Sequence, residues 1–174
     1  ATFIASTFSS NSGPGLVRTG TGALNLTNCL IYRQSNDAVR VSAGTVTIGN
    51  CTFALNNGWG VTNNGGTVSI LNSILWSNGL GGVVGSATVN YSRSQEVLAG
   101  MNNSTTDPRF MDVTIHDFTL KMSSPAINAG SNEAWMATGR DLAGNTRKIG
   151  TEVDQGCYES PGGFAGASVL IEIF

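Results

Sequence analysis

A repeat of 22 residues in the first half of the chain constrains the fold more than any other feature. The segment 44–65 aligns with the 22 residues before it and with the 22 residues after it. The matched columns are Leu24/Val46/Val68, Leu26/Ile48/Ile70, Asn28/Asn50/Asn72, Cys29/Cys51/Ser73, Ile31/Phe53/Leu75 and Val39/Val61/Val83. Repeats of this length are too short to bury an apolar face alone, so each one packs on its neighbours in a solenoid.

Within each repeat, apolar and polar residues alternate, as in the run Val46, Thr47, Ile48. A period of two is typical of a β-strand and not of a helix. Residues 1–8 fit the same pattern at a shift of 23, and a fifth copy places Val89 over Val68 at a shift of 21. We therefore predict an all-β fold, a parallel β-helix of about five regular coils with a period of 22–23 over residues 1–97.

The regular pattern ends after Val97, and the remaining chain divides into two parts. Residues 98–160 are predicted to form an exposed loop, up to residue 107, and then an irregular C-terminal cap of the same domain. Residues 161–174 combine a Gly-rich lead with an apolar strand that contains Val169, Leu170, Ile171, Ile173 and Phe174. This strand could fold back on its own molecule, cover the open edge of the first coil, or pair with another chain, so self-association is an expectation.

The composition of the chain argues against two classes of partner, nucleic acid and a membrane. Only 11% of residues are charged, against roughly 25% in an average soluble protein. A net charge of −2 provides no basic surface to neutralise phosphates, so nucleic acid is not expected as a partner. No apolar run approaches the ~20 residues of a membrane helix, so no membrane span is expected.

Two columns of the repeat are polar and stack along the solenoid axis. The column Asn28, Asn50, Asn72 predicts a structural ladder of buried amides that bond along the axis; exposure of these turn positions to a ligand is the alternative. Cys29 and Cys51 lie in adjacent rungs, where a disulfide is one interpretation. Because their side chains point the same way, two buried thiols are favoured.

The closing region resembles a known group of proteins in five successive blocks. In order, the blocks are Asp107-Pro108-Arg109-Phe110, Asp117-Phe118-Thr119-Leu120, Ser124-Pro125-Ala126-Ile127-Asn128-Ala129-Gly130, Asp141-Leu142-Ala143-Gly144-Asn145-Thr146-Arg147 and Asp154-Gln155-Gly156-Cys157-Tyr158-Glu159. They are similar to the blocks that close right-handed parallel β-helix proteins of the secreted, surface-associated choice-of-anchor type, within the pectin-lyase-like superfold. Asn128, Gln155 and Cys157 depart from that pattern, and Cys157 stands where a small buried residue is usual.

This resemblance implies a right-handed β-helix, located outside the cell or at its surface. The wider superfold contains polysaccharide lyases and glycoside hydrolases, but a fold does not determine an activity. Hydrolysis needs two carboxylates about 5 to 10 Å apart, and the coils hold only Asp37 and Glu96 as acids. We therefore predict a non-catalytic module for adhesion, glycan contact or assembly; a carbohydrate-active enzyme of the same superfold is the alternative.

A third hypothesis is an ice-binding solenoid, because threonines recur at outward positions. Thr45 and Thr67 occupy one such column, next to Thr47 and Ser69. Ala23 interrupts the first of these columns, so this hypothesis ranks below the other two.

The chain has three tryptophans, Trp59, Trp76 and Trp135, and these are the candidate ligand-binding residues. Sugar rings stack on exposed indoles, so the candidate partner is a carbohydrate or a cell-surface glycan. Trp59 lies in a Gly-Trp-Gly corner that leaves little room to bury it within a ladder. Packing of the indoles against neighbouring loops is the alternative interpretation.

A weaker candidate site is a calcium site near the end of the chain. Asp141 and Arg147 flank a turn, and an ion pair that closes this turn is the first interpretation. The alternative is a calcium ion bound by Asp141, Asn145 and a carboxylate of Asp154 or Glu159. No other cofactor is predicted, and no residue is assigned a catalytic role.

The assignment of inward and outward positions can be tested on two adjacent residues. Ile48→Asp should abolish folding because a carboxylate would replace an apolar side chain in the core, whereas Thr47→Asp should be mild. Circular dichroism and thermal unfolding of both variants measure the effect. Equal tolerance of the two substitutions would show that the assignment is wrong.

Overall fold

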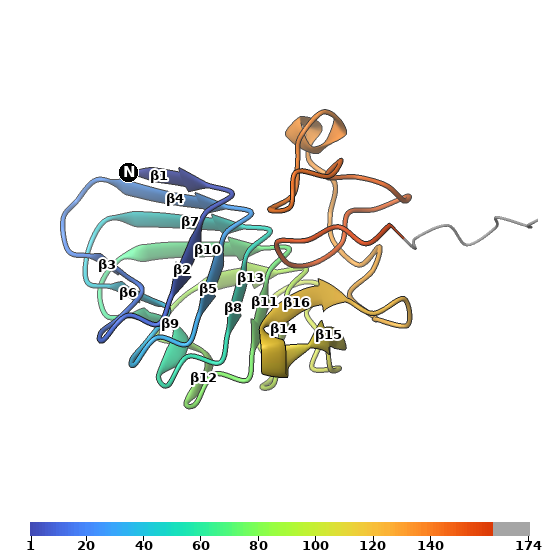
Figure 1. Cartoon of the computed structure of the whole chain (residues 1–174). Helices are drawn as coiled ribbons and strands as arrows, with labels where there is room; N and C mark the ends of the chain where they lie inside the picture. Colours follow the sequence, from blue (N-terminus) through green and yellow to red (C-terminus); the bar gives the residue numbers. More distant parts are fainter. Residues whose placement is uncertain (162–174) are drawn as a thin grey trace, which may run out of the picture.

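The computed structural model describes residues 1–161 of the chain, and most of its strands wind in stacked coils (Figure 1). Sheet A contains β1 (Thr2–Ile4), β4 (Ala23–Thr27), β7 (Thr45–Gly49), β10 (Thr67–Leu71) and β13 (Thr88–Asn90). Sheet B contains β2 (Thr7–Ser9), β5 (Leu30–Tyr32), β8 (Thr52–Ala54), β11 (Ile74–Trp76) and β14 (Arg93–Ser94). Sheet C contains β3 (Leu16–Arg18), β6 (Val39–Val41), β9 (Trp59–Asn63) and β12 (Gly81–Val84). All pairs within these sheets are parallel, and the predicted parallel β-helix is confirmed.

The 22-residue register is confirmed between neighbouring coils. Val46 pairs with Leu24 on one side and with Val68 on the other. The resulting inner core consists of fully or almost fully buried side chains, namely Leu24, Leu26, Cys29, Ile31, Ala38, Val39, Val41, Val46, Ile48, Cys51, Phe53, Val61, Val68, Ile70, Leu75 and Val89. Because successive coils place like residues on like residues, each apolar column is continuous along the axis.

The predicted register of the fifth coil is wrong by two residues. Val89 pairs with Ile70, a step of 19, and not with Val68. The chain takes six residues from Val83 to Val89, whereas it takes nine from Val61 to Ile70 in the preceding coil. A shift of two residues keeps Val89 on the inner face, because the side-chain period of a strand is two.

The column Asn28, Asn50, Asn72 lies at the corner between sheets A and B, and all three residues are buried. Their φ angles are 52°, 51° and 52°, a left-handed conformation that asparagine tolerates better than most residues. The bonding differs from the prediction, since Nδ2 of Asn28 donates to the Arg140 carbonyl at 2.6 Å and Nδ2 of Asn72 to the Ser131 carbonyl at 2.9 Å. The amides of Asn28 and Asn72 therefore fasten the C-terminal region to the coils.

A second amide column, which the sequence reasoning missed, bonds along the axis. It lies at the corner between sheets B and C and contains Gln34, Asn56 and Asn78, all buried. The backbone N–H of Gln34 donates to Oδ1 of Asn56 at 3.0 Å, and that of Asn56 donates to Oδ1 of Asn78 at 3.2 Å. Each side chain thus satisfies a buried backbone donor of the neighbouring coil.

The three cysteines are free and buried, so the favoured interpretation of two thiols is confirmed. The backbone N–H of Cys29 donates to Sγ of Cys51 at 3.4 Å, and that of Cys51 donates to Oγ of Ser73 at 3.1 Å. Burial raises the pKa of the Cys157 thiol to about 12. At this pKa the Cys157 thiol is protonated at neutral pH. This agrees with the interpretation of Cys157 as a small buried residue.

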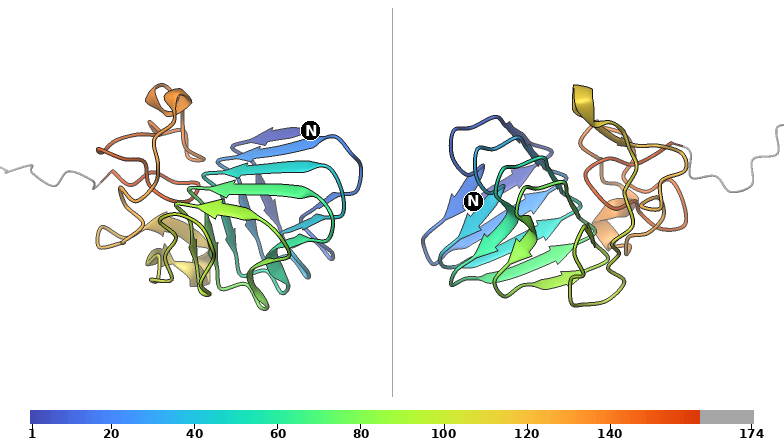
Figure 2. Two further views of the ribbon diagram at one scale, coloured as in Figure 1. Left: turned by 180° about the vertical axis from the view of Figure 1, so that it is seen from behind. Right: turned by 90° about the horizontal axis from the view of Figure 1, so that it is seen from below.

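The C-terminal region packs against the outer face of sheet B, beside the coils (Figure 2). It contains an antiparallel pair of strands, β15 (Phe110–Asp112) and β16 (Asp117–Leu120). It also contains two short 3₁₀ helices, η1 (Val113–Ile115) and η2 (Ala134–Ala137), each about one turn long and called a turn below. A second buried cluster, here called the lateral core, joins the two parts; its members are Leu30, Ala54, Ile74, Phe110, Phe118, Leu120, Ala126 and Cys157. Sheet B is therefore covered on both faces.

The segment predicted as an exposed loop contributes to the end of the inner core. Leu98 packs against that core, and Asn103 accepts a hydrogen bond from the Ser92 backbone N–H at 3.0 Å. At the other end, β1, β2 and β3 are the terminal strands of their sheets in the described part of the chain. The predicted self-association strand with Val169 and its neighbours lies outside the described residues, so self-association stays a prediction.

The lateral core predicts a large effect of Phe118→Ala on stability. Phe118 is 1% exposed, and removing a buried aromatic ring should lower the free energy of unfolding by about 3–5 kcal/mol. Met122→Ala is the matched control, since Met122 is 81% exposed and a change there should cost less than about 0.5 kcal/mol. Urea denaturation measures both variants, and equal small effects would contradict the lateral core.

Candidate functional site

A groove of about 300 Å³ runs between the outer face of sheet A and the η2 turn. Sheet A forms the floor, and η2 forms one wall. The residues that line the groove are Thr27, Thr47, Ile48, Gly49, Ser69, Ile70, Leu71, Thr88, Asn90, Glu133 and Trp135. Floor and wall come from segments that are more than 40 residues apart in the sequence.

The floor of the groove presents a row of hydroxyl groups. Thr47, Ser69 and Thr88 are direct neighbours on β7, β10 and β13, because strand pairing places them in register. Gly49 lies at the end of β7 between Thr27 and Leu71 of the adjacent strands. A Cβ added at Gly49 would meet no atom within 4 Å, so the glycine leaves space in the floor.

The wall of the groove presents one aromatic ring. Met136 is fully buried and anchors η2, while Trp135 is 37% exposed. The Trp135 Nε1–H donates to Oε2 of Glu133 at 2.8 Å, which fixes the edge of the indole. A Cβ on Gly139 would lie 2.7 Å from Cε3 of Trp135, so the ring rests directly on this glycine.

The other two candidate tryptophans lie elsewhere on the molecule. Trp59 begins β9 in sheet C, and its ring lies over Gly81 of the next coil. Trp76 ends β11 in sheet B, packs against the lateral core and lines a separate cavity with Arg109 and Lys121. The three indoles therefore do not form one platform, and Trp135 is the one beside the hydroxyl row.

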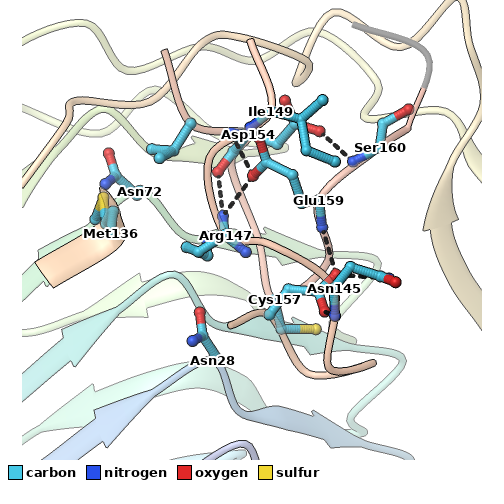
Figure 3. Close-up of polar contacts among 12 residues, drawn as sticks. Asn28, Asn72, Met136, Asn145, Arg147, Ile149, Asp154, Cys157, Glu159 and Ser160 are labelled. Carbon is cyan, nitrogen blue, oxygen red and sulfur yellow. Dashed lines mark hydrogen bonds and ion pairs between the residues drawn. The ribbon is translucent and has the colours of Figure 1, made fainter. Parts of the chain in front are cut away.

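Hydrogen bonds link the candidate calcium residues Asp141, Asn145, Asp154 and Glu159 near the end of the described chain. Figure 3 labels the last three of them. Their carboxylate oxygens accept hydrogen bonds from backbone N–H groups. Asp141 accepts from Asn145 at 2.7 Å and from Glu159 at 2.9 Å. Asp154 accepts from Asn128 at 2.8 Å and from Ser160 at 2.7 Å.

The described residues give no direct support to the predicted calcium site. Calcium takes 6–8 oxygen ligands that converge on one point. Among residues 1–161, no three His, Cys, Asp or Glu side chains form a group that could hold a metal ion. A calcium site here stays a prediction from the sequence, and nothing below depends on it.

A buried arginine lies at the centre of this cluster. Arg147 donates to the Asp154 carbonyl at 2.6 Å and pairs with Oε2 of Glu159 at 3.6 Å. The predicted ion pair between Arg147 and Asp141 is therefore corrected to one with Glu159. The reason is geometric, because both oxygens of Asp141 are aligned with backbone donors of its own turn and of Glu159.

Glu159 is a carboxyl group of this cluster whose pKa is shifted to near neutrality. Burial away from water raises the pKa of Glu159 to about 7; the negative charge of Asp154 adds to this effect, and Arg147 opposes it. Burial also raises the pKa of Asp154. The cluster thus holds more protons at mildly acidic pH than the same groups would in an unfolded chain.

A family model described as a right-handed β-helix region matches residues 1–132, about three quarters of the chain. The chain belongs to the right-handed β-helix family. Searches of curated proteins and of solved structures returned no match. In this β-helix protein the matched span contains the whole floor of the groove and ends just before Glu133 and Trp135, which form its wall. Within residues 1–161, no helix is long and apolar enough to cross a membrane.

The sequence reasoning identified parts of this groove but not their combination. It singled out Trp135 as a candidate ligand contact, and it noted Thr47 and Ser69 only as outward positions. Glu133 and Gly49 were missed. Nothing in the linear pattern links residue 49 with residue 133, because their proximity depends on how the C-terminal region packs on the coils.

The raised pKa values in the buried cluster predict that stability falls as the pH rises. The folded state holds a proton on Glu159 up to about pH 7, whereas an unfolded glutamate releases it near pH 4.3. The free energy of unfolding should therefore decrease by about 1–3 kcal/mol between pH 4.5 and pH 7.5. Thermal unfolding across this range measures it.

The variant Glu159→Gln provides the control for this pH dependence. The amide keeps the size of the side chain and does not titrate, so the decrease in stability should become smaller. An identical pH profile in both proteins would show that Glu159 does not carry the effect.

Proposed function

We propose that this right-handed β-helix chain is a non-catalytic module that contacts a glycan through the groove on sheet A. The observation that carries the proposal is the position of Trp135 beside the hydroxyl row of Thr47, Ser69 and Thr88. One partly exposed indole faces a polar floor in a concave site. Binding sites combine an apolar surface with a few well-placed polar groups in this way.

The chemistry of a sugar ring matches both surfaces. Its C–H face is apolar and can lie on the indole of Trp135, and its hydroxyl groups can exchange hydrogen bonds with Thr47 and Ser69. The floor is held in place because β7 and β10 are hydrogen-bonded on both sides within sheet A, and β13 pairs with β10. A rigid site reduces the entropy that is lost on binding.

The groove offers little support for the alternative of a carbohydrate-active enzyme. Glu133 is the single carboxylate among the described residues that line it, and hydrolysis uses two. Asp141, Asp154 and Glu159 lie in the separate buried cluster, where backbone donors occupy them. These contacts favour binding over turnover as the function of the groove.

Adhesion at a cell surface or outside the cell is the setting that we propose for this binding. The family supports it, since a stacked β-helix presents a long face to a ligand. The closing blocks from Asp107 to Glu159, with their resemblance to surface-associated β-helix proteins, support it as well. The ice-binding hypothesis gains nothing from the structure, because the η2 turn stands beside the threonine face.

Replacement of Trp135 tests the proposal. In a glycan array and in affinity electrophoresis with polysaccharides, Trp135→Ala should weaken binding by about five- to tenfold, as expected for the loss of an aromatic contact of ~1–1.5 kcal/mol. Trp59→Ala removes the same side chain from sheet C and should leave the affinity unchanged. Thermal unfolding checks that both variants remain folded.

Two results would overturn the proposal. One is equal affinity of the Trp135→Ala variant and the unmodified chain for every bound glycan. The other is turnover of a polysaccharide that disappears when one carboxylate is replaced, which would establish the enzyme alternative instead.

A further inference from the structure

We propose that Glu133 makes the groove selective for neutral glycans and excludes uronates. This inference rests on the proposed function and specifies the class of sugar that the same groove binds. It follows from the charge of the lining residues, from the position of the Glu133 carboxylate, and from the depth that Gly49 provides.

The described lining of the groove contains an acidic residue and no basic one. Glu133 contributes a carboxylate, and no Lys, Arg or His is found among the described residues of the lining. A uronate bound in this space would bring a second carboxylate close to Glu133 without a cation between them. Like charges at about 4 Å reduce affinity by roughly tenfold or more, depending on how much water remains between them.

The position of the carboxylate makes this repulsion selective. Because Oε2 of Glu133 accepts a hydrogen bond from Nε1 of Trp135 at 2.8 Å, the charge is held at the edge of the indole. A sugar that stacks on this indole projects its ring substituents toward that edge. A hydroxyl or hydroxymethyl group there can donate a hydrogen bond to the carboxylate, whereas the carboxylate of a uronate cannot.

The depth of the groove depends on a single glycine. Neighbouring strands place Thr27 and Leu71 beside Gly49, but at Gly49 itself the space above the floor is open. Gly49 is also not among the residues with positive φ, so a larger residue can replace it without backbone strain. A side chain at this position would enter the groove, and its Cβ would contact neither Glu133 nor Trp135.

The experiment uses pairs of polysaccharides that differ only in the carboxyl group. Polygalacturonate and its carboxyl-reduced form are one pair, and glucuronoxylan and its carboxyl-reduced form are another. Isothermal titration calorimetry at low and high salt measures the affinity of the unmodified chain, Glu133→Gln and Gly49→Thr. Thermal unfolding confirms that each variant is folded.

We expect the unmodified chain to bind the neutral member of at least one pair about tenfold or more tightly than the acidic member. Glu133→Gln should narrow this ratio by raising the affinity for the acidic member, because glutamine keeps an acceptor for the indole but carries no charge. High salt should narrow the ratio in the unmodified chain as well. Gly49→Thr should abolish binding of both members.

The outcomes separate this inference from the proposed function. Failure to bind any member of any pair would overturn both. Binding that depends on Trp135 but prefers the acidic member, or a ratio that Glu133→Gln does not change, would overturn the inference alone. Full binding by Gly49→Thr would show that the ligand lies outside this groove and would overturn both.

Discussion

The structure depends on the parallel stacking of coils in register. Hydrogen bonds between strands of adjacent coils require each coil to lie directly on the previous one, so equivalent residues meet along the axis. The apolar columns close the inner core, and columns such as Gln34, Asn56 and Asn78 satisfy buried backbone donors at the corners. A substitution at an inward position of one coil therefore changes the packing of the coils on both sides of it. This explains why similar apolar residues recur at the inward positions of successive coils.

The same stacking produces outer faces of different character. On sheet A the outward residues include Thr47, Ser69 and Thr88, and part of this face remains open as the floor of the groove. On sheet B, outward Leu30 and Ile74 are apolar and are buried in the lateral core. The C-terminal region covers the outer face of sheet B, and its η2 turn reaches the edge of the outer face of sheet A. The groove forms because packing of the C-terminal region on sheet B places Trp135 beside the outer face of sheet A.

The C-terminal region is also held by buried polar contacts that are sensitive to protonation. Arg147 is fully buried and pairs with Glu159, while its Nε and Nη1 atoms have no partner among the described residues. Burying a charge lowers the stability of a fold unless the charge is well paired. We therefore expect this part of the fold to be less stable than the inner core. The inner core, in contrast, consists mainly of apolar columns.

The sequence by itself determined the coils. The columns Leu24/Val46/Val68 and Leu26/Ile48/Ile70 specify strand, register and core face, because the period of the repeat and the period of a strand are both local properties. Apolar residues lie on both faces of sheet B, such as Ile74 beside Leu75, and this signal of a covered outer face was not used in the sequence predictions. The register of the fifth coil was missed, since a shift of two residues leaves the inward and outward alternation of the strand unchanged.

Only the tertiary structure decided where the C-terminal region lies and what site it creates. The five blocks after Asp107 carry turns and caps without a repeat, so their pattern does not reveal which sheet they cover. Contacts such as Asn28 to Arg140 span 112 residues and have no local signature. The placement of Glu133 and Trp135 over Gly49 follows from these long-range contacts, because packing between distant segments depends on shape and pairing in three dimensions and not on the order of residues along the chain.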